Sequence, residues 1–145
     1  LIISAYDEEN TVGIVLDKLR NLDYLHEIVV VDNGSTDSTY DVLLDSKKKD
    51  DRIKIYRIEK NKGLGCGLKL AIENMRSNGQ ISVYEKYIGE KIAFVLSGGE
   101  TDITKELTEE NILKLEKKAI SDLINENLTI ERLEHVLETG KYLRN

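Results

Sequence analysis

Residues 27–39 read EIVVVDNGSTDST, and this stretch decides the fold. The β-branched residues 28–31 directly precede Asp32, and such a run is typical of a parallel strand that is covered on both faces. The polar residues after Asp32 form a turn, and Thr36 or Asp37 is placed to cap the helix that follows. The stretch therefore predicts a buried strand, a tight turn and a helix, with several polar side chains where the strand ends.

Two further strands are expected, one on each side of this stretch. The apolar residues 1–5 and the alternating residues 53–58 have the lengths and patterns of strands. A helix is predicted after the first strand, capped by Asn10 or Thr11, and another after the glycine loop at residues 61–65. Alternating strands and helices predict a parallel sheet with right-handed crossovers, whose ligands bind at the carboxyl ends of the strands.

The pattern changes near residue 78, and only helices are expected beyond it. We predict helices over residues 84–96, from a cap at Thr108, and from Thr129 to a glycine cap at Gly140. Three short helices bury little surface alone, so this layer is expected to pack on an exposed face of the sheet. The predicted fold class is α/β, a short parallel three-layer-type sheet with a C-terminal helical layer. The expected domains are an α/β unit over residues 1–78 and a helical segment over residues 79–145.

The composition is that of a globular protein that does not bind nucleic acid. The 145 residues have a formal net charge of −6, whereas a nucleic-acid-binding surface needs clustered Lys and Arg. The lysine run at residues 47–49 is followed by two aspartates and is interpreted as a solvated helix end. No apolar run approaches the ~20 residues of a membrane span. The single cysteine, Cys66, excludes an internal disulfide and predicts a reducing compartment, so we expect a cytoplasmic protein.

Three motifs resemble those of a known enzyme family. They are residues 3–12 (ISAYDEENTV), residues 27–39 and residues 61–65 (NKGLG). Their order, spacing and expected elements are similar to those of the inverting glycosyltransferases of family 2. The resemblance covers the first half of the chain. It implies that the carboxyl ends of the strands hold the nucleoside of a UDP-sugar or a similar donor.

The resemblance also implies roles for individual residues. Asp32 is an acceptor for the imide N–H of a uracil base, Glu8 is an acceptor for the ribose hydroxyls, and Tyr6 lies against the base. Lys62 is assigned to a phosphate contact or to a solvated loop position, two alternatives that the sequence supports equally. Asp37, in contrast, is interpreted as a helix cap rather than a ligand contact.

The chain departs from this family at the catalytic centre. The family has a fourth strand ending in Asp-x-Asp, which holds a metal on the diphosphate, and this chain has no such motif. The segment Glu100-Thr101-Asp102 follows two glycines too far downstream and is interpreted as a loop. The carboxylate that serves the family as general base has no counterpart either. We therefore assign no catalytic residue and no manganese or magnesium site, and expect a catalytically incomplete fragment.

The C-terminal part has a resemblance of its own. Residues 88–99 (IGEKIAFVLSGG) and 131–145 (ERLEHVLETGKYLRN) are similar to the C-terminal helical end of enoyl-CoA hydratase/3-hydroxyacyl-CoA dehydrogenase proteins. Neither segment carries the oxyanion hole or the catalytic acids of that family, and His135 is interpreted as a surface helix residue. Two unrelated families therefore meet near residue 78, which suggests a chimera.

Three hypotheses about function remain open at the level of sequence. The chain is a nucleotide-sugar-binding module with little or no transfer activity, an artificial or recombinant chimera with a structural role only, or a truncated active glycosyltransferase. The absence of proline, and a first residue that is already part of a strand, favour an assembled or excised sequence. An open sheet edge, at residues 1–5 or 53–58, is expected to favour homo-oligomers.

Overall fold

The computed structural model describes residues 1–99 and 106–145 of the chain. Within these residues, strands and helices alternate at first and only helices follow, which is the order that the sequence predicts. The fold class is α/β, as expected. Contacts divide the chain into two compact units, Leu1–Ala71 and Ile72–Asn145.

The first unit is built on a parallel sheet of three strands. These strands are β1 (Ile2–Ala5), β2 (Ile28–Asn33) and β3 (Ile53–Ile58), with β2 in the middle. Ala5 pairs with Asp32 in the register of β1 and β2, and Asp32 pairs with Arg57 in that of β2 and β3. Because all three strands are parallel, their carboxyl ends lie at one edge of the sheet, and the polar motif residues follow there.

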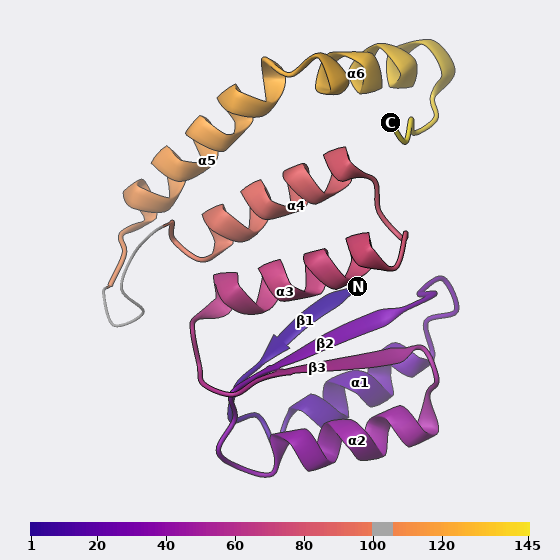
Figure 1. Cartoon of the computed structure of the whole chain (residues 1–145), viewed down its shortest axis with the longest axis vertical. Coiled ribbons are helices and arrows are strands. Elements are labelled where there is room, and N and C mark those ends of the chain that lie inside the picture. The colour runs from indigo at the N-terminus through magenta and orange to yellow at the C-terminus, as the bar shows by residue number, and fades with distance from the viewer. Residues whose placement is uncertain (100–105) are drawn as a thin grey trace. The chain divides into compact units, whose positions relative to one another are not determined.

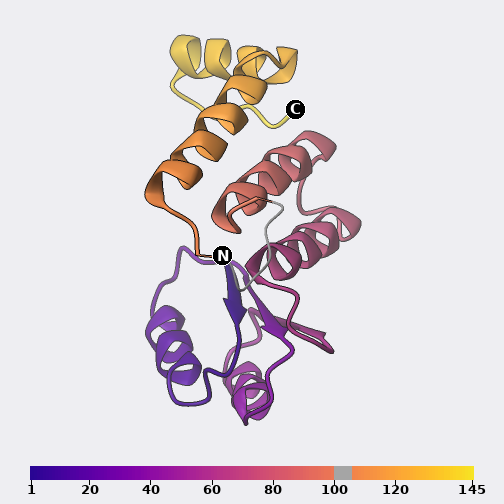
Figure 2. The same ribbon diagram turned by 90° about the vertical axis from the view of Figure 1, so that its left-hand side faces the viewer.

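Helices cover both faces of this sheet (Figure 1). The helices α1 (Val12–Arg20) and α2 (Thr39–Lys49) lie next to each other on one face, as both views show (Figure 2). The part of α3 (Leu64–Ser77) up to Ala71 lies on the other face. Gly67 in this part lies so close to the sheet that a Cβ atom there would be 3.0 Å from Ser4 Oγ. Two covered faces explain why β2 is apolar at successive positions rather than at alternate ones.

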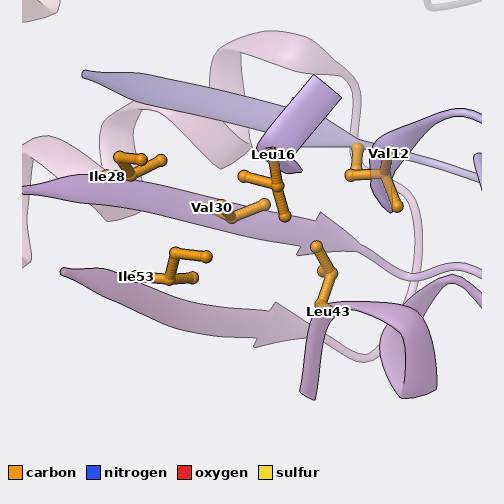
Figure 3. Close-up of a cluster of buried hydrophobic side chains, with 7 residues drawn as sticks. Val12, Leu16, Ile28, Val30, Leu43 and Ile53 are labelled. Atoms are coloured by element: carbon orange, nitrogen blue, oxygen red, sulfur yellow. The ribbon is translucent and has the colours of Figure 1, made fainter. Parts of the chain in front are cut away.

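The main core of the first unit lies between the sheet and α1 and α2 (Figure 3). Its buried side chains are Ala5, Val12, Leu16, Ile28, Val30, Leu43 and Ile53. The two residues from β2, Ile28 and Val30, are two positions apart and therefore share a face of the strand. Burial of one such aliphatic side chain contributes about 1.5–3 kcal/mol, so this cluster fixes the sheet and both helices as one body.

The second unit is helical. Besides the end of α3, it contains α4 (Val83–Leu96), α5 (Glu109–Ile124) and α6 (Asn127–Thr139). Helix α5 lies beside α4, and α6 continues from α5 after a short turn (Figure 1). Thr108 caps α5 as the sequence predicts, with its side chain accepting a hydrogen bond from the N–H of Asn111. Gly140 ends α6 with a φ of +68°, also as predicted.

The start of α6 differs from the prediction. The helix begins at Asn127 with Glu126 as N-cap, two residues before the expected start at Thr129. The Thr129 hydroxyl is instead hydrogen-bonded to the hydroxyl of Tyr84 in α4. The hydroxyl that was expected to cap the helix is therefore bonded to a residue 45 positions away in the chain.

The sheet has two outer strands, β1 and β3, among the residues that the structure describes. These are the strands at which open edges were expected, and pairing between copies of the chain through them stays a prediction. In the same two described ranges, no helix combines the length and the apolar character needed to cross a membrane.

Candidate functional site

Hydrogen bonds join the loops that follow β1 and β2. The N–H of Asp7 donates to Ser35 Oγ at 3.0 Å, and the N–H of Thr36 donates to Asp7 Oδ1 at 2.7 Å. The N–H of Glu8 donates to Thr39 Oγ1 at 2.7 Å. Asp7 has a φ of +51°, which is uncommon for a residue other than glycine. These reciprocal bonds hold it in that conformation and fix the two loops against each other.

Asp37 and Glu9 extend this connection. Asp37 accepts hydrogen bonds from the N–H groups of Thr39, at 2.9 Å, and of Glu9, at 3.2 Å, and Glu9 Oε2 accepts one from the N–H of Ser38 at 3.0 Å. Partial burial acts to raise the pKa of Asp37, but the hydrogen bonds from Thr39 and Glu9 outweigh it and lower that pKa. Asp37 therefore bonds the start of α2, although the residue at the N-cap position is Ser38.

A third loop, before α3, is attached to the end of β2. The side-chain amide of Asn33 donates to Asn61 Oδ1 and to the carbonyl of Gly63, both at 3.0 Å. The N–H of Lys62 donates to Asn33 Oδ1 at 3.4 Å. Gly34 has a φ of +78°, and a Cβ atom there would lie 2.5 Å from the Asn61 nitrogen. The loop thus lies directly on the turn that follows β2, which only glycine allows.

Asp32 lies at the centre of these loops and is fully buried. Its Oδ1 accepts a hydrogen bond from the N–H of Ser35 at 3.0 Å. Its Oδ2 lies 3.1 Å from Arg57 Nε, yet no described residue donates a hydrogen bond to it. The guanidinium of Arg57 also lies 4.4 Å from the ring centre of Tyr40. A buried carboxylate oxygen with a nearby charge but no aligned donor is an acceptor that a ligand can use.

The other predicted site residues follow the ends of the strands. Tyr6 comes directly after β1 and is 43% exposed. Glu8 is exposed, and its Oε2 accepts a hydrogen bond from the Thr11 hydroxyl. Lys62 is exposed in the loop before α3. Hydrogen bonds from backbone N–H groups to side chains link the loops that carry these residues, whereas no described hydrogen bond joins the side chain of Tyr6, Glu8 or Lys62 to Asp32.

Sequence reasoning missed Arg57, Asn33 and Ser35 as parts of this site. The signal for Arg57 was present, because the alternation over β3 places it on the face of Ile53 and Ile55, at the carboxyl end of the strand. No comparable local signal identifies Asn33 or Ser35, because their partners lie about 30 residues away.

The carboxylates at this edge do not fit a divalent metal ion. Within residues 1–99 and 106–145, no group of three or more His, Cys, Asp or Glu side chains is arranged to hold one. Backbone N–H groups already bond Asp7, Glu9 and Asp37. The segment Glu100-Thr101-Asp102, interpreted above as a loop, lies outside the described residues.

Comparison with known proteins gives one family and several relatives. The family model "Glycosyl transferase family 2" matches residues 1–89. The chain is 33% identical over 97 residues to the "Putative glycosyltransferase EpsH" of Bacillus subtilis, covering 66% of this chain and 24% of the relative. It is 25% identical over 134 residues to the "Dolichyl-phosphate beta-glucosyltransferase" of Mus musculus, covering 85% of this chain and 36% of the relative.

A relative of another kind also matches. The chain is 37% identical over 80 residues to a "Probable 3-hydroxyacyl-CoA dehydrogenase" of Bacillus subtilis, which is 55% of this chain and 10% of that protein. Because only 56 residues follow residue 89, this 80-residue match must share residues with the segment that the family model covers. The chain spans between a tenth and about a third of the length of these three relatives.

Proposed function

Since the chain belongs to glycosyl transferase family 2, we propose that the carboxyl edge of its sheet binds the nucleoside diphosphate of a sugar donor. The observation that carries the proposal is Asp32, whose buried Oδ2 receives no hydrogen bond from the described residues. An unsatisfied buried acceptor costs free energy, and the imide N–H of a uracil base is a donor of the right kind. UDP is therefore the nucleotide to test first.

Three exposed side chains support the same proposal. Tyr6 offers an exposed aromatic ring at the end of β1, against which a base can stack. The carboxylate of Glu8 is suited to accept hydrogen bonds from ribose hydroxyls, and the ammonium of Lys62 is suited to a phosphate. The loops that carry these residues are joined to the end of β2, the turn after it and the start of α2 by hydrogen bonds between backbone N–H groups and side chains, so little ordering is needed on binding.

We also propose that this chain alone binds a nucleotide without transferring a sugar. The acidic residues at the site do not fit a metal ion, so no catalytic step is assigned to one. The chain covers 24% and 36% of the length of the two glycosyltransferase relatives described above. A cytoplasmic location stays a prediction from the single cysteine.

The test is calorimetric titration of the 145-residue chain with UDP, with and without Mn²⁺. We expect saturable binding that Mn²⁺ does not change. Replacing Asp32 with asparagine keeps the shape but removes the charged acceptor, and should weaken binding at least about tenfold, since a hydrogen bond to a charged group contributes about 1.5–3 kcal/mol. Asp45→Asn, at an exposed position of α2, is the matched control and should bind like the wild type.

Each of the three hypotheses predicts a different result in this titration. Absence of heat at millimolar UDP, from a chain that circular dichroism shows to be folded, contradicts the proposal and favours a chimera whose motifs serve the fold alone. An aggregation-prone chain whose UDP binding depends on Mn²⁺ only when the missing sequence is restored favours the truncated transferase. The observation in favour of motifs that serve the fold alone is that Asp7, Glu9 and Asp37, all from the motifs, bond backbone N–H groups of neighbouring loops.

A further inference from the structure

The helical unit contains a cavity that the proposed function does not use. Its volume is about 560 Å³, which is within the usual range of small-molecule sites. Its walls come from the start of α4, the start of α6 and the last residues of the chain, which lie beside the start of α4 (Figure 1). The lining residues are Ser82, Val83, Tyr84, Tyr87, Glu126, Leu128 and Asn145. All of them belong to the second unit, so that unit alone builds the cavity.

The surface of this cavity is mainly apolar. Tyr84 is only 7% exposed, whereas the aliphatic side chains of Val83 in α4 and Leu128 in α6 remain 68% and 37% exposed. The rings of Tyr84 and Tyr87 are stacked, with their centroids 5.8 Å apart. A ligand with an apolar body would remove these exposed aliphatic groups from water, which is the main driving force of binding in such sites.

The aromatic wall of the cavity is held in place by contacts within the unit. The guanidinium of Arg132 lies 5.2 Å from the ring centre of Tyr84, and Lys91 Nζ lies 5.5 Å from that of Tyr87. The hydroxyl of Tyr84 is hydrogen-bonded to that of Thr129 in α6. The two rings are therefore ordered before a ligand binds, which reduces the entropic cost of binding.

The cavity carries one negative charge that nearby cations do not balance. The two cations on the tyrosine rings and a third at the end of the chain each have a carboxylate partner: Lys91 has Asp122, Arg144 has Glu85, and Arg132 has Glu131 through the side chain of Asn145. Glu126 is the one charged residue among the described residues that line the cavity. In the described part of the chain, its carboxylate has a single hydrogen bond, from the Tyr87 hydroxyl at 3.4 Å, which is long for such a bond.

We propose that this cavity binds a small organic amine, whose ammonium group lies beside the Glu126 carboxylate. The ammonium donates to a carboxylate that is poorly satisfied, and the aliphatic or aromatic body of the ligand covers Val83 and Leu128. A ligand that carries a carboxylate instead meets the like charge of Glu126 and is disfavoured. The site is independent of the proposed nucleotide site, because the two share no residue.

The experiment is an NMR titration of the full chain at neutral pH with three probes that have the same phenyl body. These are phenethylamine, which is cationic, phenethyl alcohol, which is neutral, and phenylacetate, which is anionic. We expect phenethylamine to bind about two- to fivefold more tightly than the alcohol, as for a partly exposed ion pair, and phenylacetate to bind most weakly. The amide shifts should be concentrated at the starts of α4 and α6.

Variants separate the charge of the site from its apolar surface. Glu126→Gln keeps the size of the side chain and an acceptor for Tyr87, so it should lower the affinity for phenethylamine about two- to fivefold and leave that for phenethyl alcohol unchanged. Glu134→Gln, at an exposed position of α6 outside the lining, is the matched control and should bind like the wild type. Leu128→Ala should weaken binding of all three probes, with circular dichroism showing that the helices persist.

Three outcomes would overturn the inference. Equal affinity for the three probes would mean that the carboxylate does not select the ligand. A wild-type preference for the amine in Glu126→Gln, or an equal loss for amine and alcohol, would exclude a role for the charge of Glu126. Absence of amide shifts in the helical unit of a folded chain would show that the cavity does not bind these ligands. None of these results bears on UDP binding, so the two proposals succeed or fail separately.

Discussion

The two units of the chain are held together in different ways. In the first unit, seven buried apolar side chains from the sheet and two helices form one cluster. In the second, α5 and α6 contain no fully buried residue, and α4 buries Tyr84 and Ala93. The first unit therefore depends on apolar burial, whereas the second depends more on helix caps and half-buried contacts.

Ion pairs are among the contacts that connect the elements of the helical unit. Lys91 Nζ lies 2.6 Å from Asp122 Oδ2, which joins α4 to α5, and Arg144 Nη2 lies 2.9 Å from Glu85 Oε2. Such pairs are partly exposed and contribute about 0–1 kcal/mol each. Because of this difference, we expect single substitutions to lower the free energy of unfolding far more in the first unit than in the second.

The largest effect is expected at Leu43. This side chain of α2 is fully buried in the main core, so Leu43→Ala should destabilise the first unit by about 3–5 kcal/mol through lost burial and a cavity. Leu44→Ala, at the next and 38% exposed position, is the control and should cost less than about 1 kcal/mol. Urea denaturation followed by circular dichroism measures both.

A leucine-to-alanine substitution in the helical unit tests whether the two units differ in their dependence on apolar burial. Leu123 of α5 is only partly buried, and Leu123→Ala should cost about 1–2 kcal/mol. A loss at Leu123 as large as that at Leu43 would contradict the view that the two units depend on different interactions.

An effect smaller than that of Leu43→Ala is expected at two glycines with positive φ. Gly34 in the first unit and Gly140 in the second have φ of +78° and +68°. Gly34→Ala should cost about 2–3 kcal/mol, since the strained backbone adds to a clash with the Asn61 backbone. Gly140→Ala meets nothing within 4 Å and should cost about 1–2 kcal/mol from strain alone. Equal losses in thermal or urea unfolding would show that the clash is relieved by movement of the loop.

Much of the fold could be predicted from the sequence, because local patterns determine it. The β-branched run of β2 and the alternation of β3 locate the strands, and the cap at Thr108 locates the start of α5. The start of α6 at Asn127 was not predicted, and the Thr129 hydroxyl that was expected to cap the helix is hydrogen-bonded to Tyr84, a residue that no local sequence pattern links to it.

The candidate site was only partly predictable for the same reason. The motifs identify Asp32, and the turn after it, from residues close together in the chain. The positions of Arg57 and Asn33 beside Asp32 come from strand register and from contacts between residues about 25–30 positions apart, which exist only once the sheet has formed. Whether Tyr6, Glu8 and Lys62 bind a ligand stays a prediction.

The smallest effect expected is a loss of stability of the helical unit at low pH. Glu85 accepts hydrogen bonds from Arg144 and from the N–H of Ser82, at which the α4 helix is capped. The bond from Arg144 is the main cause that lowers the pKa of Glu85 below its usual value of 4.5. A lowered folded-state pKa means that the stabilisation is complete above pH 4.5 and is lost as the pH falls through the folded-state pKa.

Glu85→Gln tests this contribution, because glutamine still completes the capping box but carries no charge. The variant should be less stable than the wild type by up to about 1 kcal/mol at pH 7, since Arg144 is 63% exposed, and the difference should shrink toward zero below pH 4.5. Urea denaturation at pH 7, 5, 4 and 3 measures it, with Glu90→Gln, at another position of α4, as the control for general acid effects. A difference that stays constant across this range would mean that packing of the side chain, and not its charge, holds Arg144 against α4.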